Sequence, residues 1–314
     1  MTPIPCSSGD HLADRRAHYA DMLAASGDTG AAVDLMADAL TLAPGWVAGW
    51  FRLGELAESA ELPEQAQTGF ARALLLDPAD RLGATLRLDL LRCVSLTETM
   101  PVAFIEALFD QYAPRFDESL VEQLQYSVPR HLAAALPNRH FDHVLDLGCG
   151  TGLMGAALRG RCTRLTGWDI SEGMLAEAAT KGVYDDLARR DLNTLAPELA
   201  QYDLIVAADV FIYLGALEAI VAWAALALRP GGVLAFSCEA HKGEGPMSLR
   251  PSRRYAHNPK YIQNLLEQAG LGRSDLVPLV IRQDRGADVT GFLTVSLSPA
   301  CQTDRSGESE LEPA

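Results

Sequence analysis

Residues 143–152 read His-Val-Leu-Asp-Leu-Gly-Cys-Gly-Thr-Gly, an apolar run that passes into a glycine-rich turn. A helical pattern follows near 153–159, so this segment predicts a strand, a tight turn and a helix. Glycines at such a turn let the backbone approach a ligand that is held at the N-terminus of the helix. We therefore expect an α/β domain with a small-molecule site at the carboxyl end of this strand.

From residue 101 onward, short apolar runs alternate with helical patterns. This alternation is typical of a mostly parallel sheet that is covered by helices on both faces. Only residues 283–288 separate the last two runs, so we expect these two strands to form an antiparallel hairpin. The expected strands are 144–147, 164–168, 204–207, 233–237, 279–282 and 291–297, with further helices near 171–180, 215–228 and 258–269.

The glycine spacing helps to choose between ligands. Gly148 and Gly150 fit the start of a dinucleotide-binding fingerprint, but its third glycine would fall at Leu153. Asp146 lies inside the strand, where a phosphate site has no use for an anion. The turn therefore favours a ligand with an amino group and a sulfonium, and it disfavours a nicotinamide oxidoreductase.

Acidic residues follow further strands at the same edge of the sheet. Asp169 lies 21 residues beyond Gly148 and can accept hydrogen bonds from both hydroxyls of a ribose. Met174 would lie beside an adenine, and Asp191 can accept from its exocyclic amine. Structural alternatives stay open, because Asp169 can be a helix N-cap, Asp146 a cap or loop-bonding residue, and Asp191 an ordinary strand-end acid.

The segments VLDLGCGTG, GWDIS and LRPGGVL together resemble the class I S-adenosylmethionine-dependent methyltransferases, over roughly residues 101–298. The resemblance implies a Rossmann-like, seven-stranded sheet with the last strand antiparallel, and S-adenosylmethionine as the cofactor. It also implies a cofactor site made of Tyr112, Phe116, Asp146, Gly148, Cys149, Gly150, Thr151, Gly152, Asp169, Ile170, Met174, Asp191, Leu192, Ala208 and Asp209.

Within that site, the resemblance assigns residues to parts of the cofactor: Asp146, Gly148 and Gly150 to the methionine moiety, Asp169 to the ribose, Asp191 and Leu192 to the adenine, and Ala208 to the region of the sulfonium. Residues 109–117 would fold over the cofactor, with Tyr112 bonding its carboxylate and Phe116 excluding water. The alternative for Phe116 and Tyr112 is core packing. Loop 209–215 can likewise serve mainly for core packing. Cys149 is expected in the turn only because it is small, and not as a nucleophile.

The sequence indicates less about the part of the site that would bind the methyl acceptor. Residues 239–260 concentrate charged and aromatic side chains among glycines and prolines: His241, Glu244, Arg250, Arg253, Arg254, Tyr255 and His257. Insertions at this edge of the sheet shape acceptor pockets, and loops often carry catalytic groups. His241, Tyr255 and His257 are candidates for a general base, although each is as readily a packing or surface residue. The catalytic residue, and the choice among O-, N- and C-methylation, stay open.

Two copies of a 34-residue pattern precede this domain, at 13–46 and 47–80. The second copy resembles the tetratricopeptide repeat at Trp50, Leu53, Gly54, Ala57, Ala66, Phe70, Ala73 and Pro78. Small residues in this pattern let two antiparallel helices approach, while large ones fill the gap between them. A capping helix over 81–96 would complete an all-α domain over 13–98. These repeats either bind a partner protein or only pack on the next domain.

Composition excludes several classes of function. The net charge of −15 disfavours binding to nucleic acid, which needs a cationic face. No apolar run reaches the ~18 residues of a membrane span, and the first residues lack the features of a signal peptide. The six cysteines are scattered, without metal-ligand spacing. We therefore expect a cytoplasmic protein without a metal, with disorder over 1–12 and in the acidic tail 299–314.

Taken together, these patterns predict a methyltransferase that moves a methyl group from S-adenosylmethionine to an unidentified acceptor. A small molecule is favoured over a protein as the acceptor, and the whole chain resembles bacterial predicted methyltransferases with N-terminal tetratricopeptide repeats. The alternative is a repeat scaffold or regulatory protein whose methyltransferase-like domain binds the cofactor without turnover.

Overall fold

The helical pattern of the first part of the chain forms two helix pairs in the computed structural model, which describes residues 4–92, 99–118, 120, 124–272, 275–284 and 286–300. Asp10 caps the first helix by accepting hydrogen bonds from the backbone N–H groups of Leu12 and Ala13. The pairs consist of α1 (His11–Ala25) with α2 (Thr29–Leu42) and α3 (Val47–Ser59) with α4 (Pro63–Leu76).

Helices α3 and α4 touch through their backbones. A Cβ atom on Gly69 would lie 2.6 Å from the backbone nitrogen of Gly54, and a Cβ atom on Gly54 would lie 2.6 Å from the ring of Phe70. Phe70 is fully buried between the two helices. The predicted close approach at Gly54, filled by Phe70, is therefore confirmed.

Two predicted boundaries differ from the structure. The disorder expected over 1–12 is wrong from Asp10 onward, because this residue caps a helix that begins at His11. The expected capping helix is α5 (Ala84–Arg92), which begins three residues later than predicted. Parts of these predictions fall outside the described residues: residues 1–3 of the expected disorder, residues 93–96 of the capping helix, and residues 301–314 of the acidic tail.

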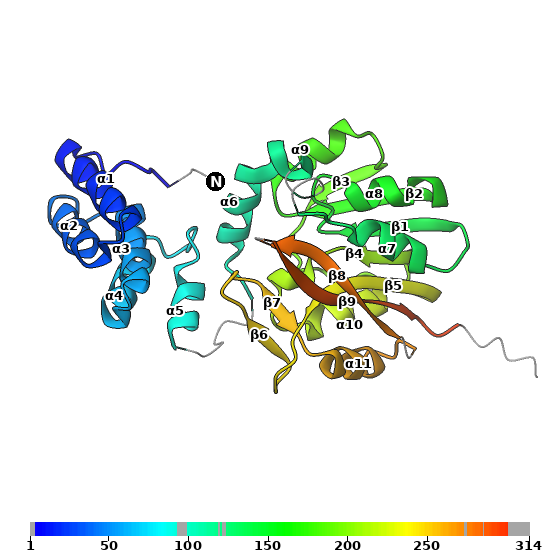
Figure 1. Cartoon of the computed structure of the whole chain (residues 1–314). Helices are drawn as coiled ribbons and strands as arrows, with labels where there is room; N and C mark the ends of the chain where they lie inside the picture. Colours follow the sequence, from blue (N-terminus) through cyan, green and yellow to red (C-terminus); the bar gives the residue numbers. More distant parts are fainter. Residues whose placement is uncertain are drawn as a thin grey trace, which may run out of the picture.

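The second part is a nine-stranded sheet flanked by helices (Figure 1). Its strands are β1 (Phe141–Leu147), β2 (Cys162–Asp169), β3 (Asp186–Arg189), β4 (Tyr202–Ala207), β5 (Leu228–Ala240), β6 (Met247–Leu249), β7 (Tyr255–His257), β8 (Leu276–Asp284) and β9 (Ala287–Leu297). Strands β3, β2, β1, β4 and β5 run parallel in that order. Strand β9 is antiparallel to β5 and to β8.

The predicted parallel sheet with a final antiparallel hairpin is thus confirmed. The predicted number of seven strands is wrong, because the insertion after β5 adds two more. Strand β7 pairs in parallel with the end of β5, and β6 pairs antiparallel with β7. This extra hairpin lies at the edge of the sheet where a ligand site was expected.

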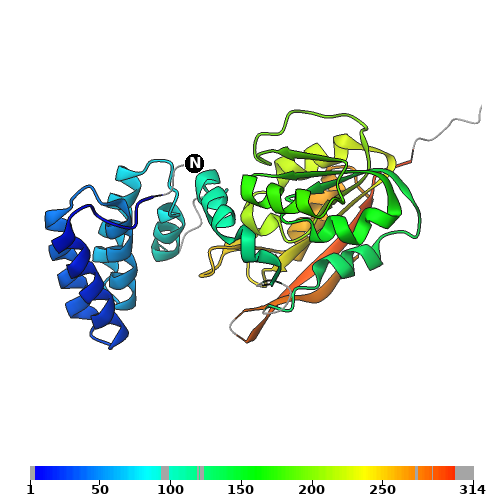
Figure 2. The same cartoon turned by 90° about the horizontal axis from the view of Figure 1, so that it is seen from above.

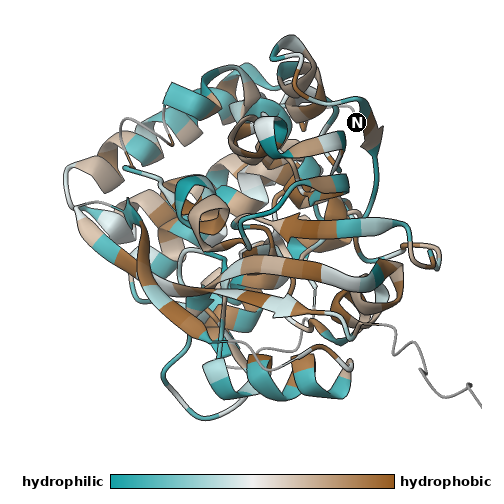
Figure 3. Cartoon of the chain, turned by 90° about the vertical axis from the view of Figure 1, so that its right-hand side faces the viewer, coloured by the Kyte–Doolittle hydropathy of each residue, from teal (hydrophilic) through white to brown (hydrophobic). Residues whose placement is uncertain are grey.

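Apolar side chains alternate between the two faces of the sheet, and each face is covered by its own helices. On one face, Leu132 of α7 (Val128–Ala135) and Leu158 of α8 (Leu153–Leu158) share a buried cluster with Val144 of β1. On the other, Trp223 of α10 (Glu218–Ala227) and Ile262 of α11 (Pro259–Gln268) pack in the cluster of Leu145. Figure 3 shows hydrophobic residues along the central strands of the sheet.

Helices α5 and α6 (Val102–Tyr112) lie between the helix pairs and the sheet (Figures 1 and 2). Leu86 of α5, Phe104 of α6 and Tyr255 of β7 belong to one buried cluster. The guanidinium of Arg253 lies 4.8 Å from the ring centroid of Phe104 and donates a hydrogen bond to the carbonyl oxygen of Leu82. The two parts of the chain therefore pack on each other. Among the described residues, no helix is both long and apolar enough to cross a membrane.

Candidate active site

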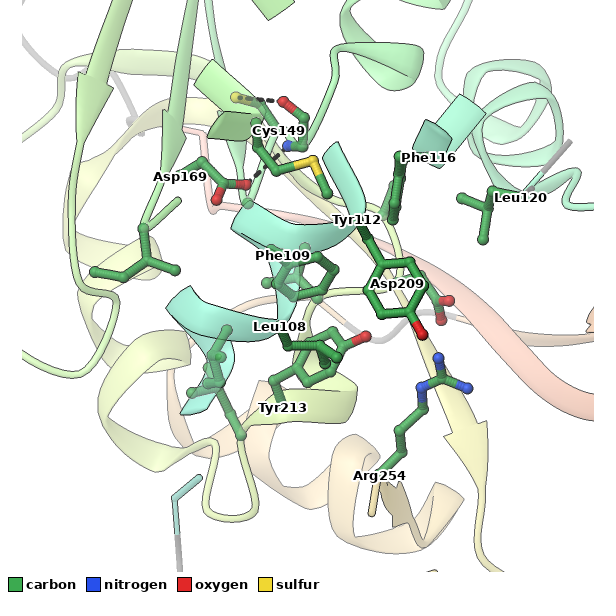
Figure 4. A pocket seen from close by; sticks show the side chains of 18 of the residues that line it. Leu108, Phe109, Tyr112, Phe116, Leu120, Cys149, Asp169, Asp209, Tyr213 and Arg254 are labelled. Atoms are coloured by element: carbon green, nitrogen blue, oxygen red, sulfur yellow. Dashed lines mark hydrogen bonds between the residues drawn. The ribbon is translucent and has the colours of Figure 1, made fainter. Parts of the chain in front are cut away.

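A cavity of about 590 Å³ opens at the carboxyl ends of β1, β2 and β4. Helix α6 and the turn between β6 and β7 form its other walls, and Figure 4 shows side chains from both pointing into it. All of the cofactor residues predicted from the sequence line this cavity except Gly152. The topology therefore brings together residues that are spread from Tyr112 to Asp209.

The glycine-rich turn needs its glycines. Gly148, Gly150 and Gly152 have φ angles of +60°, +53° and +93°, in the left-handed region that side chains disfavour. A Cβ atom on Gly148 would also lie 2.6 Å from the side chain of Val210. Gly152 is the N-cap of α8, and a Cβ atom there would face Tyr184 at 3.0 Å, which explains why it does not line the cavity.

Asp146 combines burial with an unused acceptor. The side chain is 1% exposed, and the hydroxyl of Tyr184 donates to its Oδ2 over 2.6 Å. Its Oδ1 atom is buried and has no hydrogen-bond partner among the described residues. Burial raises the pKa of Asp146 to about 7, although the Tyr184 hydrogen bond opposes this shift. The free oxygen can accept a hydrogen bond from an amino group, as the methionine moiety of S-adenosylmethionine would require.

Asp169, at the end of β2, holds the turn from the other side. Its Oδ2 accepts from the backbone N–H of Gly150 over 2.8 Å, and its Oδ1 accepts from that of Ser171 over 2.9 Å. Burial raises the pKa of this carboxyl. The side chain of Ser171, and not that of Asp169, caps α9 (Glu172–Thr180) by accepting from the N–H of Met174. The N-cap alternative for Asp169 is therefore wrong.

Farther along the same edge, Ile170, Met174, Asp191 and Leu192 form an apolar slot with one carboxylate. Asp191 accepts from the backbone and the side-chain nitrogens of Asn193 through Oδ1, both over 2.9 Å. An oxygen of Asp191 is thus left for a donor in the slot, such as an exocyclic amine. These residues fit a flat, mostly apolar ring such as adenine.

Residues 109–117 lie along the cavity, which Phe109, Tyr112 and Phe116 line. Asp110 accepts hydrogen bonds from the hydroxyl of Ser171 over 2.5 Å and from the N–H of Gly173 over 3.1 Å. Asp117 accepts from Thr151 and forms an ion pair of 2.6 Å with Lys181. The segment is thereby tied to both ends of α9 and to the glycine-rich turn. Tyr112 and Phe116 both line the cavity, and Tyr112 stays 53% exposed.

The opposite wall carries a buried arginine that was not predicted from the sequence. Arg282 of β8 is 1% exposed and bonds Oδ2 of Asp209 over 2.7 Å and also Oε1 of Glu239. Burial raises the pKa of Asp209, while Arg282 opposes the shift. Asp209 lines the cavity, but its charge is already paired with Arg282. Arg254 lies on this side as well, with Tyr213 beside it (Figure 4).

None of the predicted base candidates lines the cavity. Tyr255 and His257 are fully buried on β7, because this strand joins the sheet and packs its side chains inside. His257 Nε2 lies 3.0 Å from the carbonyl oxygens of Leu214 and Gly215, and burial lowers its pKa to about 4. His241 Nε2 lies 3.1 Å from the carbonyl oxygen of Glu244. The geometry argues against each of them as the base.

Several charged residues of the cavity were not predicted as site residues. Arg254 lies in the insertion whose arginines were noted, and Arg282 was visible as a charged residue in an apolar strand. Arg87 comes from α5, and no signal in the sequence connects it with the glycine-rich turn. Among the described residues, no group of His, Cys, Asp and Glu is arranged to hold a metal ion.

Comparison with known proteins relates the chain to methyltransferases. Residues 144–232 match a family model described as a methyltransferase domain. Three bacterial enzymes are similar to the chain. The malonyl-[acyl-carrier protein] O-methyltransferase of Enterobacter lignolyticus is 34% identical over 42% of this chain and 52% of its own length. The trans-aconitate 2-methyltransferase of Paracidovorax citrulli is 33% identical over 51% of this chain and 65% of its own length. The malonyl-[acyl-carrier protein] O-methyltransferase of Dechloromonas aromatica is 30% identical over 55% of this chain and 68% of its own length.

The fold has solved counterparts as well. Phosphoethanolamine N-methyltransferase 2 of Haemonchus contortus superposes with a TM-score of 0.51 at 12% identity, over 65% of this chain and 61% of its own. The chain spans about half the length of the Enterobacter relative, but it covers more than two thirds of the Dechloromonas enzyme. The chain therefore belongs to the class I S-adenosylmethionine-dependent methyltransferases, the enzymes that take their methyl group from S-adenosylmethionine.

Proposed function

We propose that this chain transfers the methyl group of S-adenosylmethionine to a small-molecule acceptor. One observation carries the proposal. The unpartnered buried oxygen of Asp146 and the carboxylate of Asp169 flank the turn at Gly148 and Gly150, in the wall of a single cavity of about 590 Å³. An amino group and a ribose are what these two acids can hold.

The residues then have separate tasks. Asp146 holds the amino group of the methionine moiety, and Asp169 accepts from the ribose hydroxyls. The slot at Asp191 and Leu192 takes the adenine, and Ala208 lies near the sulfonium. When bound, S-adenosylmethionine supplies an electrophilic methyl group on a positively charged sulfur. Holding two reactants in line contributes about 7–11 kcal/mol to the lowering of a barrier.

The segment over the cavity has the task of closing the site. Its ties at Asp110 and Asp117 keep Phe116 beside Gly150, where a Cβ atom would lie 3.9 Å from the ring. Phe116 excludes water from the methionine end, and Tyr112 donates a hydrogen bond to the cofactor carboxylate. Water is thereby kept from competing with the acceptor for the methyl group.

Two observations favour a small molecule over a protein as the acceptor. The site is a cavity of about 590 Å³ between α6 and the turn that joins β6 and β7, and a cavity of this kind suits a small acceptor better than a large chain. The names of two relatives refer to a malonyl group on a carrier protein and to trans-aconitate. Both names refer to a small acid or to its acyl group.

The N-terminal helices are proposed to be two tetratricopeptide repeats with α5 as their cap. The 34-residue pattern and the backbone contact between Gly54 and Gly69 support this proposal. Because Arg87 of α5 lines the cavity, we assign the helical part a role in the wall of the active site. Binding of a partner protein would use the helices that lie farther from the sheet.

The test is transfer of a labelled methyl group. The full chain is incubated with S-adenosylmethionine and with panels of small acids, amines and phenols. We expect labelled product with one class of acceptor, and loss of this product in Asp169→Ala. Asp186→Ala is the matched control, because it removes a carboxylate from the exposed edge strand β3. Tight cofactor binding without transfer to any acceptor would support the scaffold alternative instead.

A further inference from the structure

We propose that the acceptor is a carboxylic acid in its ionised form, and that Arg254 binds it in the cavity. This inference rests on the proposed function, because it names the substrate class of the same site. It is carried by the geometry of one turn, by the balance of charges in one wall, and by the kinds of side chain that line the cavity.

The turn between β6 and β7 sends two neighbouring arginines to different places. The N–H of Arg250 donates to the carbonyl oxygen of Arg254 over 2.9 Å and closes the turn, and Arg253 has a φ angle of +58°. Arg253 also lines the cavity, but its guanidinium lies over the ring of Phe104 and donates to the carbonyl oxygen of Leu82 in the helical part. Arg254 points into the cavity, with its guanidinium on the side of Tyr112 and Asp209 (Figure 4).

Around Arg254, the arginines outnumber the carboxylates that pair with them. Three arginines gather here: Arg250, Arg254 and Arg282. Asp209 and Glu239 are the carboxylates near them, and both pair with Arg282, while Arg250 lies 3.5 Å from Glu239.

Among the described residues, no ion pair joins Arg254 to a carboxylate, and Tyr213 lies beside it. The nearness of Tyr213 and Asp209 raises the pKa of Arg254 further, so it keeps its charge. A half-buried cation in this position favours an anion in the cavity.

The side chains that line the cavity point to the same class of acceptor. Its described lining contains no histidine, lysine or glutamate. The cavity is also lined by five aspartates. Three of them lie on the cofactor side: Asp146, Asp169 and Asp191. Asp209 is paired with Arg282, and Asp284 lies at the end of β8. An acceptor that must lose a proton needs a general base. A carboxylic acid is ionised at neutral pH and needs none.

The step balances without a proton. A lone pair of the carboxylate oxygen forms the new bond to the methyl carbon, and the bond from that carbon to sulfur breaks with its electron pair left on sulfur. The products are a methyl ester and S-adenosylhomocysteine. The role of Arg254 is to bind and orient the carboxylate, whereas the aromatic side chains of α6 cover it.

Aromatic rings also attract cations, so an amine is the rival acceptor. We would titrate the full chain, saturated with S-adenosylhomocysteine, with three sets of probes in a calorimeter. The first set is malonate, glutarate and citrate. The second is malonamide and glutaramide, which keep the carbon skeletons without charge, and the third is 1,5-diaminopentane.

We expect a carboxylate to bind, and the matched amide and the diamine not to bind. Arg254→Gln should weaken carboxylate binding about tenfold or more, because it removes a charged hydrogen bond. Arg254→Lys should restore part of the affinity, since it keeps the charge but loses the planar fork. Arg164→Gln is the control, because it removes the same charge at the exposed edge of β2. S-adenosylhomocysteine should bind all of these variants within about twofold.

Three results would overturn the inference: no carboxylate binds, the amide or the diamine binds as well as the acid, or Arg254→Gln leaves carboxylate binding unchanged. In each case normal binding of S-adenosylhomocysteine would leave the proposed function standing. Failure of the wild-type chain to bind S-adenosylhomocysteine would instead remove the proposed function, and the inference with it.

Discussion

At the scale of single residues, Asp146 shows how one carboxyl is prepared for a ligand. Burial raises its pKa from 3.8 to about 7, and one of its oxygens has no partner among the described residues. Between about pH 4 and pH 7 the folded chain therefore holds a proton that the unfolded chain has lost. Asp146 thus lowers the stability of the ligand-free chain as the pH rises through this range.

The same carboxyl makes cofactor binding depend on pH. The cofactor's amino group needs the ionised form of Asp146, so affinity for S-adenosylhomocysteine should rise from about pH 6 to about pH 8. Calorimetric titration at several pH values measures this. Asp146→Asn should bind more weakly, and its affinity should change less with pH. An equally steep pH dependence in this variant would show that another group is responsible.

At the scale of elements, the segment over the cavity depends on a small set of polar ties. Lys181, at the end of α9, donates to Asp117 over 2.6 Å and to the carbonyl oxygen of Thr151 over 2.7 Å. Lys181→Met should loosen the segment and weaken binding of S-adenosylhomocysteine by roughly threefold to tenfold, because a half-exposed ion pair and a hydrogen bond are lost. Arg164→Gln, which breaks an exposed ion pair elsewhere, is the matched control. Unchanged affinity in Lys181→Met would mean that the tie does not hold the segment in place.

Strand β8 contributes a buried cation on which the acceptor wall depends. Arg282→Met would leave Asp209 and Glu239 buried without their main partner, so we expect a loss of about 3–5 kcal/mol in the free energy of unfolding. Burial already raises the pKa of Asp209 and Arg282 opposes this shift, so in the variant the pKa of Asp209 would rise further. The loss should therefore be smaller at about pH 5 than at about pH 8. Urea unfolding at both pH values measures this. A loss of the same size at both would contradict the account.

At the scale of the whole molecule, the helical part and the sheet meet around Tyr255. This side chain is fully buried, in one cluster with Leu86 of α5 and Phe104 of α6. Tyr255→Ala should lower the free energy of unfolding by about 3–5 kcal/mol, as the truncation of other large buried aromatic side chains does. It should also separate the two parts, so that heating gives two transitions and the scattering radius increases. Tyr255→Phe is the control, and it should keep a single transition. A single transition in Tyr255→Ala as well would show that the parts are coupled elsewhere.

The two halves of the site differ in how far the sequence predicts them. The cofactor half follows from local patterns, because the turn at Gly148 and the acid at Asp169 each end a strand within one continuous motif. The acceptor half does not, because Arg87, Arg254 and Arg282 come from three distant segments. Only the extra pairing of β7 with β5 turns Arg254 inward while it buries Tyr255 and His257. That pairing has no signature in the sequence.

The most direct test of the account is a calorimetric titration of the wild-type chain and of Asp169→Ala with S-adenosylhomocysteine and with NAD. The account predicts one-to-one binding of S-adenosylhomocysteine by the wild type, no binding of NAD, and a loss of about tenfold or more in the variant, which gives up charged hydrogen bonds to the ribose. Circular dichroism checks that the variant is folded. A folded wild-type chain that binds NAD, or that does not bind S-adenosylhomocysteine, would contradict the account.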